Sequence, residues 1–178
     1  MSPLVTTLVL GGARSGKSSY AERLVERSSR APLYVATAEA GDGEMADRIA
    51  RHRARRGGGW TTLEEPLDLA EVLGREAGPN RAILVDCLTL WLSNLMGAGR
   101  DPEAAGAELC RVLDALPTQV VLVSNEVGLG LVPETPLGRR FRDAQGRLNQ
   151  AVAGCVPSVV FVAAGLPLVL KPSGSTTP

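Results

Sequence analysis

One stretch constrains the fold of this chain more than any other: residues 11–18, which read Gly-Gly-Ala-Arg-Ser-Gly-Lys-Ser. This octapeptide has the form G-x-x-x-x-G-K-S. Residues 5–10 before it are β-branched and apolar, as in a buried strand, and residues 19–27 after it have the spacing of an amphipathic helix. Strand, glycine-rich turn and helix together form the context that identifies a phosphate-binding loop. The sequence therefore predicts that the chain binds a nucleoside triphosphate.

The chemistry of this loop suits a chain of phosphates. Glycines let the main chain wrap a phosphate with successive N–H groups pointing inward, and the helix N-terminus adds partial positive charge. Lys17 would reach the outer phosphates, and Ser18 would hold the Mg²⁺ that bridges them. The candidate nucleotide-binding residues of the loop are Gly11, Gly12, Ala13, Arg14, Ser15, Gly16, Lys17 and Ser18. The alternative, a glycine-rich turn that arose by chance, is disfavoured by the complete motif and its flanks.

Length and charge limit the classes of protein that the chain can be. Its 178 residues suffice for a single domain, which we place at residues 1–171, followed by a polar tail, residues 172–178, that we expect to be frayed. With 19 basic and 19 acidic residues there is no net basic field, which argues against a nucleic-acid partner. An odd count of cysteines without paired spacing argues against a disulfide framework or a zinc site.

Two features bear on location. The chain enters its first predicted strand within a few residues, which leaves no room for a signal peptide. The longest apolar run, residues 159–170, is too short to span a bilayer and is interrupted by Gly165 and Pro167. We therefore expect a cytoplasmic protein without a membrane span.

Strands and helices alternate along the chain, which predicts an α/β fold. We expect strands at residues 5–10, 33–36, 82–86, 119–123, 159–162 and 167–170, and helices at residues 19–27, 44–56, 67–77, 88–96, 103–116 and 139–153. The last two strands are joined so tightly that they must be antiparallel, and Pro167 suits an edge strand. The predicted fold is a P-loop NTPase-like, mainly parallel sheet flanked by helices, with an antiparallel C-terminal edge strand.

In such sheets ligands bind beyond the carboxyl ends of the strands. This rule brings residues 11–18, residues 37–39, Asp86 and residues 124–126 to one edge, the one formed by the carboxyl ends of the strands. Asp86 follows an apolar strand and would complete the magnesium site with Ser18, although an acidic helix cap is the alternative. Asn125 and Glu126 would orient an acceptor hydroxyl or a metal-bound water, or else satisfy the main chain of the glycine loop behind them.

The predicted helix at residues 44–56 is unusual because it holds five arginines and His52, the only histidine of the chain. A charge run is commonly a solvated face, and a histidine on an apolar face commonly belongs to the core. The functional interpretation is that a neutral imidazole attacks phosphorus. Neighbouring arginines would lower the pKa of the imidazole and stabilise charge on the transferred group.

Four stretches together carry a resemblance to one family. They are residues 11–18; Glu44-Met45…Arg48-Ile49…His52-Arg53…Arg56…Trp60…Glu64-Glu65-Pro66; Asn125-Glu126-Val127-Gly128…Val132-Pro133; and Arg139…Phe141-Arg142-Asp143…Gly146…Asn149-Gln150. They closely resemble the bifunctional adenosylcobinamide kinase / adenosylcobinamide-phosphate guanylyltransferases of cobalamin synthesis, and the match runs from about Val9 to Gln150. One departure is Gly57, where the family usually has proline.

The resemblance implies a two-step enzyme. ATP or GTP would phosphorylate adenosylcobinamide, and His52 would then take GMP from GTP and pass it to adenosylcobinamide phosphate, with Lys17 as the second catalytic residue. It also implies Mg²⁺ held by Ser18 and Asp86, and a homo-oligomer, a trimer in the family. By the same resemblance, the further contacts to the guanine nucleotide are Ala36, Thr37, Ala38, Arg53, Ala54, Arg55, Arg56, Glu64 and Asp86.

A carboxylate at Glu64 suits guanine, whose N1–H and N2–H₂ form a paired donor edge, although the sequence does not decide which acidic group reads the base. Arg139, Arg142 and Arg147 would bind substrate phosphate or a neighbouring subunit, or form a solvated helix face. Two other functions remain as alternatives: a simple P-loop kinase for another small metabolite, and a non-catalytic nucleotide-binding regulator.

Overall fold

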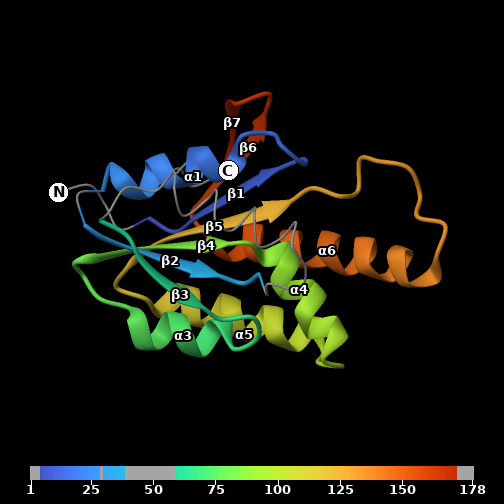
Figure 1. Cartoon of the computed structure of the whole chain (residues 1–178), viewed down its shortest axis with the longest axis horizontal. Helices are drawn as coiled ribbons and strands as arrows, with labels where there is room; N and C mark the ends of the chain where they lie inside the picture. The colour runs from blue at the N-terminus through green and yellow to red at the C-terminus, as the bar shows by residue number, and fades with distance from the viewer. Residues whose placement is uncertain (1–4, 29, 39–58, 172–178) are drawn as a thin grey trace.

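A seven-stranded sheet forms the middle layer of the computed structural model, which describes residues 5–28, 30–38 and 59–171 (Figure 1). The strands are β1 (Thr7–Gly11), β2 (Ala31–Ala36), β3 (Thr61–Glu64), β4 (Arg81–Asp86), β5 (Gln119–Asn125), β6 (Ser158–Ala163) and β7 (Leu166–Lys171). The helices are α1 (Lys17–Glu26), α3 (Leu69–Glu76), α4 (Leu88–Gly97), α5 (Pro102–Ala115) and α6 (Pro136–Cys155).

The strand order is β3-β2-β4-β5-β1-β6-β7. Neighbouring strands are parallel except β6 and β7, which pair antiparallel across the turn that joins them. The predicted α/β fold with an antiparallel C-terminal edge strand is confirmed. Pro167 lies in β7 at the edge of the sheet, where a missing N–H donor leaves no ladder bond unmade.

The two faces of the sheet are covered unequally by the described helices. The larger core cluster lies between the sheet and the layer formed by α3, α4, α5 and α6, whereas the smaller cluster lies under α1, on the other side of the sheet (Figure 1). Successive side chains of a strand point to opposite faces. Leu8 and Leu10 therefore join the larger cluster and Val9 the smaller one. A sheet buried on both faces explains why its central strands read as continuous apolar runs.

Proline and a side-chain cap mark the starts of two helices. In α5, Asp101 accepts hydrogen bonds from the main-chain N–H groups of Glu103 (2.9 Å) and Ala104 (3.4 Å). In α6, Thr135 accepts one from Gly138 (3.0 Å). Both helices carry proline in the first turn, where its missing N–H would have had no intrahelical partner.

Most expected elements differ from the observed ones by one or two residues at an end, and three differences have a clear physical reason or bear on the site. Helix α6 begins at Pro136 and ends at Cys155, so it is longer than the predicted range 139–153. Thr135 caps the helix, so that residues 136–138, which include Gly138, form its first turn. Strand β5 continues through Asn125. Strand β3 was not expected; it has four residues, its outer ones are exposed, and Leu63 is its only apolar side chain, so no hydrophobic pattern indicates it.

Some expectations lie outside the described residues, namely the helix at residues 44–56 and the frayed tail 172–178. Within the described ranges, none of the helices has both the length and the apolar character needed to traverse a lipid bilayer.

Candidate nucleotide site

The loop between β1 and α1 has the conformation that its sequence predicts. Gly16 precedes the first helical residue with φ of 94°, a left-handed value that favours glycine. The Ser15 N–H donates to the Gly12 carbonyl (3.3 Å), which closes a turn, and the Lys17 ammonium donates to the same carbonyl (3.0 Å). Lys17 thus folds back over the loop, with only 7% of its surface exposed. A phosphate bound in the loop would meet this ammonium.

Close packing explains the first glycine of the loop. A Cβ on Gly11 would lie 2.5 Å from Ser15 Oγ and 2.5 Å from the carbonyl oxygen of Val162 in β6. The turn between β6 and β7 supports the loop from the same side, because the Gly165 N–H donates to the Ser15 carbonyl (2.8 Å). Ser15 Oγ itself is buried without a hydrogen-bond partner among the described residues. Such an orphaned hydroxyl suits a site that takes up a polar ligand.

Three of the predicted nucleotide residues form a row at the carboxyl ends of neighbouring strands. Ala36 at the end of β2 lies opposite Glu64 on β3 and opposite Asp86 on β4. Gly11 lies opposite Asn125, and β5 separates β4 from the P-loop strand β1. The sheet thus brings the loop and Asp86 to one edge, as the sequence predicts, and the unexpected strand β3 adds Glu64 to the same edge.

The ends of β2 and β4 are tied together by one side chain. Thr37 is fully buried; its hydroxyl donates to the Cys87 carbonyl (2.7 Å) and accepts from the Cys87 N–H (2.8 Å). Burial, together with the charge of Asp86, raises the pKa of the Cys87 thiol to about 11, although main-chain hydrogen bonds and the charge of Lys17 act to lower it.

The donors at this edge fit Mg²⁺. This ion takes one or two protein oxygens and completes its octahedron with phosphates and water. Ser18 and Asp86 are half-buried and supply a hydroxyl and a carboxylate. Among the described residues, no group of three or more His, Cys, Asp or Glu side chains could hold a metal ion. Ser18 and Asp86 would hold the ion together with the phosphates of a bound nucleotide.

The tip of β5 is held mainly by its main chain. The Asn125 N–H donates to Thr89 Oγ1 (2.9 Å), and the Asn125 carbonyl accepts from Asn149 Nδ2 (3.1 Å). The Glu126 N–H donates to the Gly11 carbonyl (3.1 Å), while the Glu126 carboxylate accepts from the Gly128 N–H (2.6 Å). The contact with Gly128 agrees with the second alternative from the sequence, in which the Glu126 side chain accepts a hydrogen bond from the main chain of the following glycine loop.

Sequence reasoning missed a buried polar cluster under this tip. Ser124 Oγ donates to Asn149 Oδ1 (2.7 Å), and Gln145 Nε2 donates to both of those oxygens (3.0 Å each). Gln145 and Asn149 stand one helical turn apart in α6, and Gln145 is fully buried. The available signal was their spacing in register with the apolar Leu148 and Val152, which puts amides on the buried face.

The three arginines of α6 that the sequence singled out contact groups away from the P-loop. Arg139 donates to the carbonyls of Pro133 (3.0 Å) and Glu134 (2.7 Å), and so ties down the loop before the helix. Arg142 pairs with Asp143, its sequence neighbour, and Arg147 with Glu103 on α5 (2.9 Å).

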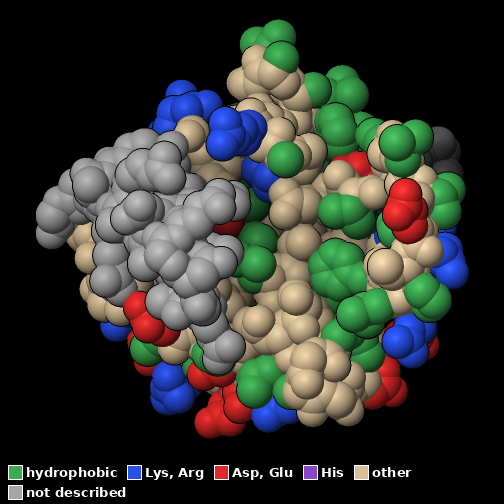
Figure 2. All heavy atoms as spheres, turned by 45° about the vertical axis from the view of Figure 1, so that its right-hand side comes forward, with side chains coloured by type: hydrophobic (Ala, Val, Ile, Leu, Met, Phe, Trp, Pro, Cys, Tyr) green, Lys and Arg blue, Asp and Glu red, His purple; other side chains and the backbone are tan. Residues whose placement is uncertain are grey.

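Apolar side chains are exposed beside this edge. The loop after β5 and the first turn of α6 expose Leu129, Leu131, Val132 and Leu137, all by more than half of their surface. Figure 2 shows several groups of apolar side chains, among backbone and charged side chains, on the side of the molecule that lies to the right in Figure 1, towards which β1 and β5 point.

Five of the predicted site residues lie outside the described residues: His52, Arg53, Ala54, Arg55 and Arg56. Ala38 is the last described residue before them.

The fold and the loop define the class of protein first. Among solved structures, the chain is similar to the ATPase EscN of the type III secretion system of enteropathogenic E. coli, with a TM-score of 0.57 and 11% identity over 96% of this chain and 48% of that one. It is also similar to the protein PH0250 of Pyrococcus horikoshii, with a TM-score of 0.55 and 11% identity over 97% of this chain and 88% of that one. At such identities the likeness shows the fold alone, and that fold is a P-loop NTPase fold.

The sequence comparisons then identify the family. Residues 7–170 match the family described as cobinamide kinase / cobinamide phosphate guanyltransferase. The bifunctional adenosylcobalamin biosynthesis protein CobP of Pseudomonas aeruginosa is 55% identical over 92% of this chain and 96% of its own length. CobU of Escherichia coli, which carries the same description, is 41% identical over 92% of this chain and 98% of its own length. The chain belongs to this family of bifunctional enzymes, which confirms the resemblance drawn from the four stretches.

Proposed function

We propose that this protein phosphorylates adenosylcobinamide with ATP or GTP and then transfers GMP from GTP, through a guanylyl-histidine on His52, to adenosylcobinamide phosphate. The observation that carries the proposal is the shared edge: the P-loop, Glu64 and Asp86 all lie along the carboxyl ends of the strands, in a chain whose family match spans residues 7–170. The family's description names both activities, and the residues at this edge supply chemistry for both.

In the kinase step the hydroxyl oxygen of the aminopropanol arm attacks the terminal phosphorus, and the bond from that phosphorus to its bridging oxygen breaks. The hydroxyl proton is released, and the nucleoside diphosphate leaves. The main-chain N–H groups of the loop and the Lys17 ammonium hold the phosphates in line for this displacement. Mg²⁺, when bound by Ser18 and Asp86, would neutralise charge on the phosphate oxygens.

In the guanylyl step a ring nitrogen of His52 attacks the α-phosphorus of GTP, and the bond to the bridging oxygen breaks, releasing pyrophosphate. The resulting N–P bond is then broken by a phosphate oxygen of adenosylcobinamide phosphate, which yields adenosylcobinamide-GDP and the free imidazole. Such a covalent intermediate divides one difficult displacement into two easier ones. Glu64 suits the base, because a carboxylate can accept from both N1–H and N2–H₂ of guanine.

The resemblance also supports a homo-trimer, and the sequence pattern supports a cytoplasmic location; both remain predictions. An unchanged elution volume at the mass of one chain, about 18.6 kDa, across a wide range of concentrations would contradict the trimer.

Labelling with GTP that carries ³²P at the α-phosphate tests the central step. In the presence of Mg²⁺ the wild-type protein should acquire a label that is labile in acid and stable in base, and His52→Ala should acquire none. A label that persists in His52→Ala would contradict the assignment. If wild-type protein takes no label yet still phosphorylates cobinamide, the simpler kinase is the better description. Nucleotide turnover that does not respond to cobinamide would favour the regulator.

The two lysines of the chain offer a matched pair for the phosphate-binding role. Lys17→Ala should lose at least about tenfold in kcat/KM for both activities, because both use the phosphates of the nucleotide. Lys171, whose ammonium donates to the carbonyls of Ala153 (3.1 Å) and Gly154 (3.2 Å) at the end of α6, should tolerate alanine without loss of activity. Equal losses in the two variants would argue against a specific role for Lys17.

A further inference from the structure

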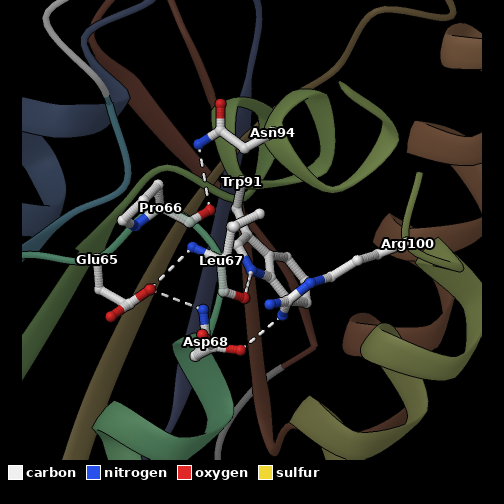
Figure 3. A network of polar contacts seen from close by, with 7 residues as sticks. All are labelled: Glu65, Pro66, Leu67, Asp68, Trp91, Asn94 and Arg100. Carbon is white, nitrogen blue, oxygen red and sulfur yellow. Dashed lines mark hydrogen bonds and ion pairs between the residues drawn. The ribbon is translucent and has the colours of Figure 1, made fainter. Parts of the chain in front are cut away.

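The loop between β3 and α3 has an ordered shape of its own (Figure 3). The Glu65 carboxylate accepts hydrogen bonds from the main-chain N–H groups of Leu67 (2.9 Å) and Asp68 (2.7 Å), two and three residues further on. These bonds fold the loop tightly around the start of α3. The Glu65 carboxylate therefore forms its hydrogen bonds within the loop. Its neighbour Glu64 is the last residue of β3 and is exposed.

Two side chains of α4 hold this loop from the other side (Figure 3). Trp91, which is 2% exposed, donates its indole N–H to the Leu67 carbonyl (2.8 Å). Asn94 stands three residues further along α4, so both side chains project from one face of the helix. Asn94 Nδ2 donates to the Pro66 carbonyl (3.1 Å) and also to the Thr37 carbonyl (2.8 Å).

The second bond of Asn94 gives it a role that Trp91 does not share. An amide NH₂ has two hydrogens, and here one goes to the chain just after β2 and the other to the chain just after β3. Those two strands are already paired up to Ala36 and Glu64, and the Glu65 N–H continues the pairing by donating to the Ala36 carbonyl (2.9 Å). Asn94 therefore spans the two strand ends immediately beyond Glu64.

We propose that Asn94 is a positioning residue for recognition of the guanine base: by joining the main chain after β2 to the main chain after β3, it fixes the Glu64 carboxylate where it accepts from N1–H and N2–H₂. The inference rests on the proposed function, because it takes the base contact of Glu64 from there. Asn94 acts through the two carbonyls and touches no reacting atom. Its amide group is the part that matters, since a carboxylate or a methyl group provides no donor for either carbonyl.

The experiment uses the full chain and compares GTP with ITP as the nucleotide donor in the nucleotidyl-transfer reaction. Inosine lacks the 2-amino group and keeps N1–H, so the ratio of kcat/KM for GTP to that for ITP measures how well the N2–H₂ contact is made. A site built around a hydrogen bond rejects an analogue that lacks the partner group. Asn94→Ala and the isosteric Asn94→Asp should both lower this ratio by about tenfold, chiefly through a higher KM for GTP.

Leu95→Val is the matched control. Leu95 is the next residue of α4, its side chain is buried in the larger core cluster, and it makes neither bond to the two carbonyls. This variant should lower the melting temperature and leave the GTP/ITP ratio at the wild-type value. If it changes the ratio as much as Asn94→Ala does, the effect comes from general loosening of the helix, and the inference is wrong.

The remaining outcomes separate the inference from the proposed function. A wild-type ratio retained in both Asn94 variants, with Glu64→Gln lowering the ratio as expected, overturns the positioning role and leaves the base contact standing. Wild-type protein without guanylyl transfer, or a ratio that Glu64→Gln does not change, contradicts the proposed function itself. A lower ratio in Glu64→Gln and both Asn94 variants, with Leu95→Val unchanged, supports the inference.

Discussion

Two parts of the same sheet edge are built in different ways. The P-loop is contiguous in sequence and is held mainly by its main chain, including the bond from the Gly165 N–H to the Ser15 carbonyl (2.8 Å). The strand-end cluster, by which we mean residues 36–37, 64–66 and 86–87, joins segments far apart in sequence. Strand pairing brings these segments together, and side chains then hold them beyond the last paired residues. Thr37 reaches across 50 positions to Cys87, and Asn94 across 57 to Thr37.

This difference predicts which amino-acid substitutions each part should tolerate. A loop held by its main chain depends on the space left by absent side chains and on unusual φ angles. A cluster held by side chains depends on donors and acceptors that must remain buried and paired. Adding a methyl group should damage the first part, and removing a hydroxyl or an amide should damage the second.

The largest effect is expected from Gly11→Ala in the P-loop. Its Cβ would lie 2.5 Å from the Val162 carbonyl oxygen, which is main chain and cannot swing aside. We expect a loss of about 3 kcal/mol in the free energy of unfolding, measured by urea denaturation. Gly12→Ala is the control, because none of the described atoms lies within 4 Å of a Cβ at that position. Equal stability of the two variants would contradict the packing argument.

Thr37→Val tests the strand-end cluster at nearly constant volume. The valine side chain has the shape of threonine and leaves the buried N–H and carbonyl of Cys87 without their shared partner. The free energy of unfolding should fall by about 2 kcal/mol. Thr37→Ser keeps the hydroxyl and loses one methyl group, so it should cost about 0.8 kcal/mol. A serine variant less stable than the valine variant would show that packing outweighs the hydrogen bonds.

Gly165→Ala tests the support that the β6–β7 turn gives to the P-loop. Gly165 has φ of 78° and Gly99 has φ of 69°, so alanine should cost each site about 1 kcal/mol of stability. Only Gly165 donates to Ser15, and only its variant should weaken nucleotide binding, by about fivefold in Kd measured by calorimetry. Unchanged affinity in Gly165→Ala would show that the turn does not shape the loop.

The smallest effect is expected from Arg100→Ala. Arg100 pairs with Asp68 at the edge of the β3–α3 loop (2.6 Å), but about half of each side chain is exposed to solvent. Exposed ion pairs contribute little because water and salt screen them. The urea midpoint and the GTP/ITP ratio should both stay at wild-type values. A clear fall in the ratio would extend the proposed role of Asn94 to this outer contact.

The sequence predicted the parts of the site that are written in contiguous residues. The octapeptide identified the P-loop, and the rule that ligands bind at the carboxyl ends of strands brought Asp86 and Asn125 to the same edge. It did not predict β3, because four residues with a single apolar side chain carry no periodicity. Nor did it find Asn94 or the Ser124–Gln145–Asn149 cluster. The hydrogen bond from Asn94 to Thr37 spans 57 positions and the one from Gln145 to Ser124 spans 21.

What the sequence determined by itself is the chemistry: an octapeptide whose glycines, lysine and serine can bind phosphates only in a strand–turn–helix context, and a set of motifs specific to one enzyme family. What only the tertiary structure decided is the placement. Strand order sets β5 between the P-loop strand and Asp86, and the side chains of α4 fix the ends of β2 and β3. The physical reason is that local patterns encode dihedral angles and burial, whereas hydrogen bonds between distant segments exist only once the chain has packed.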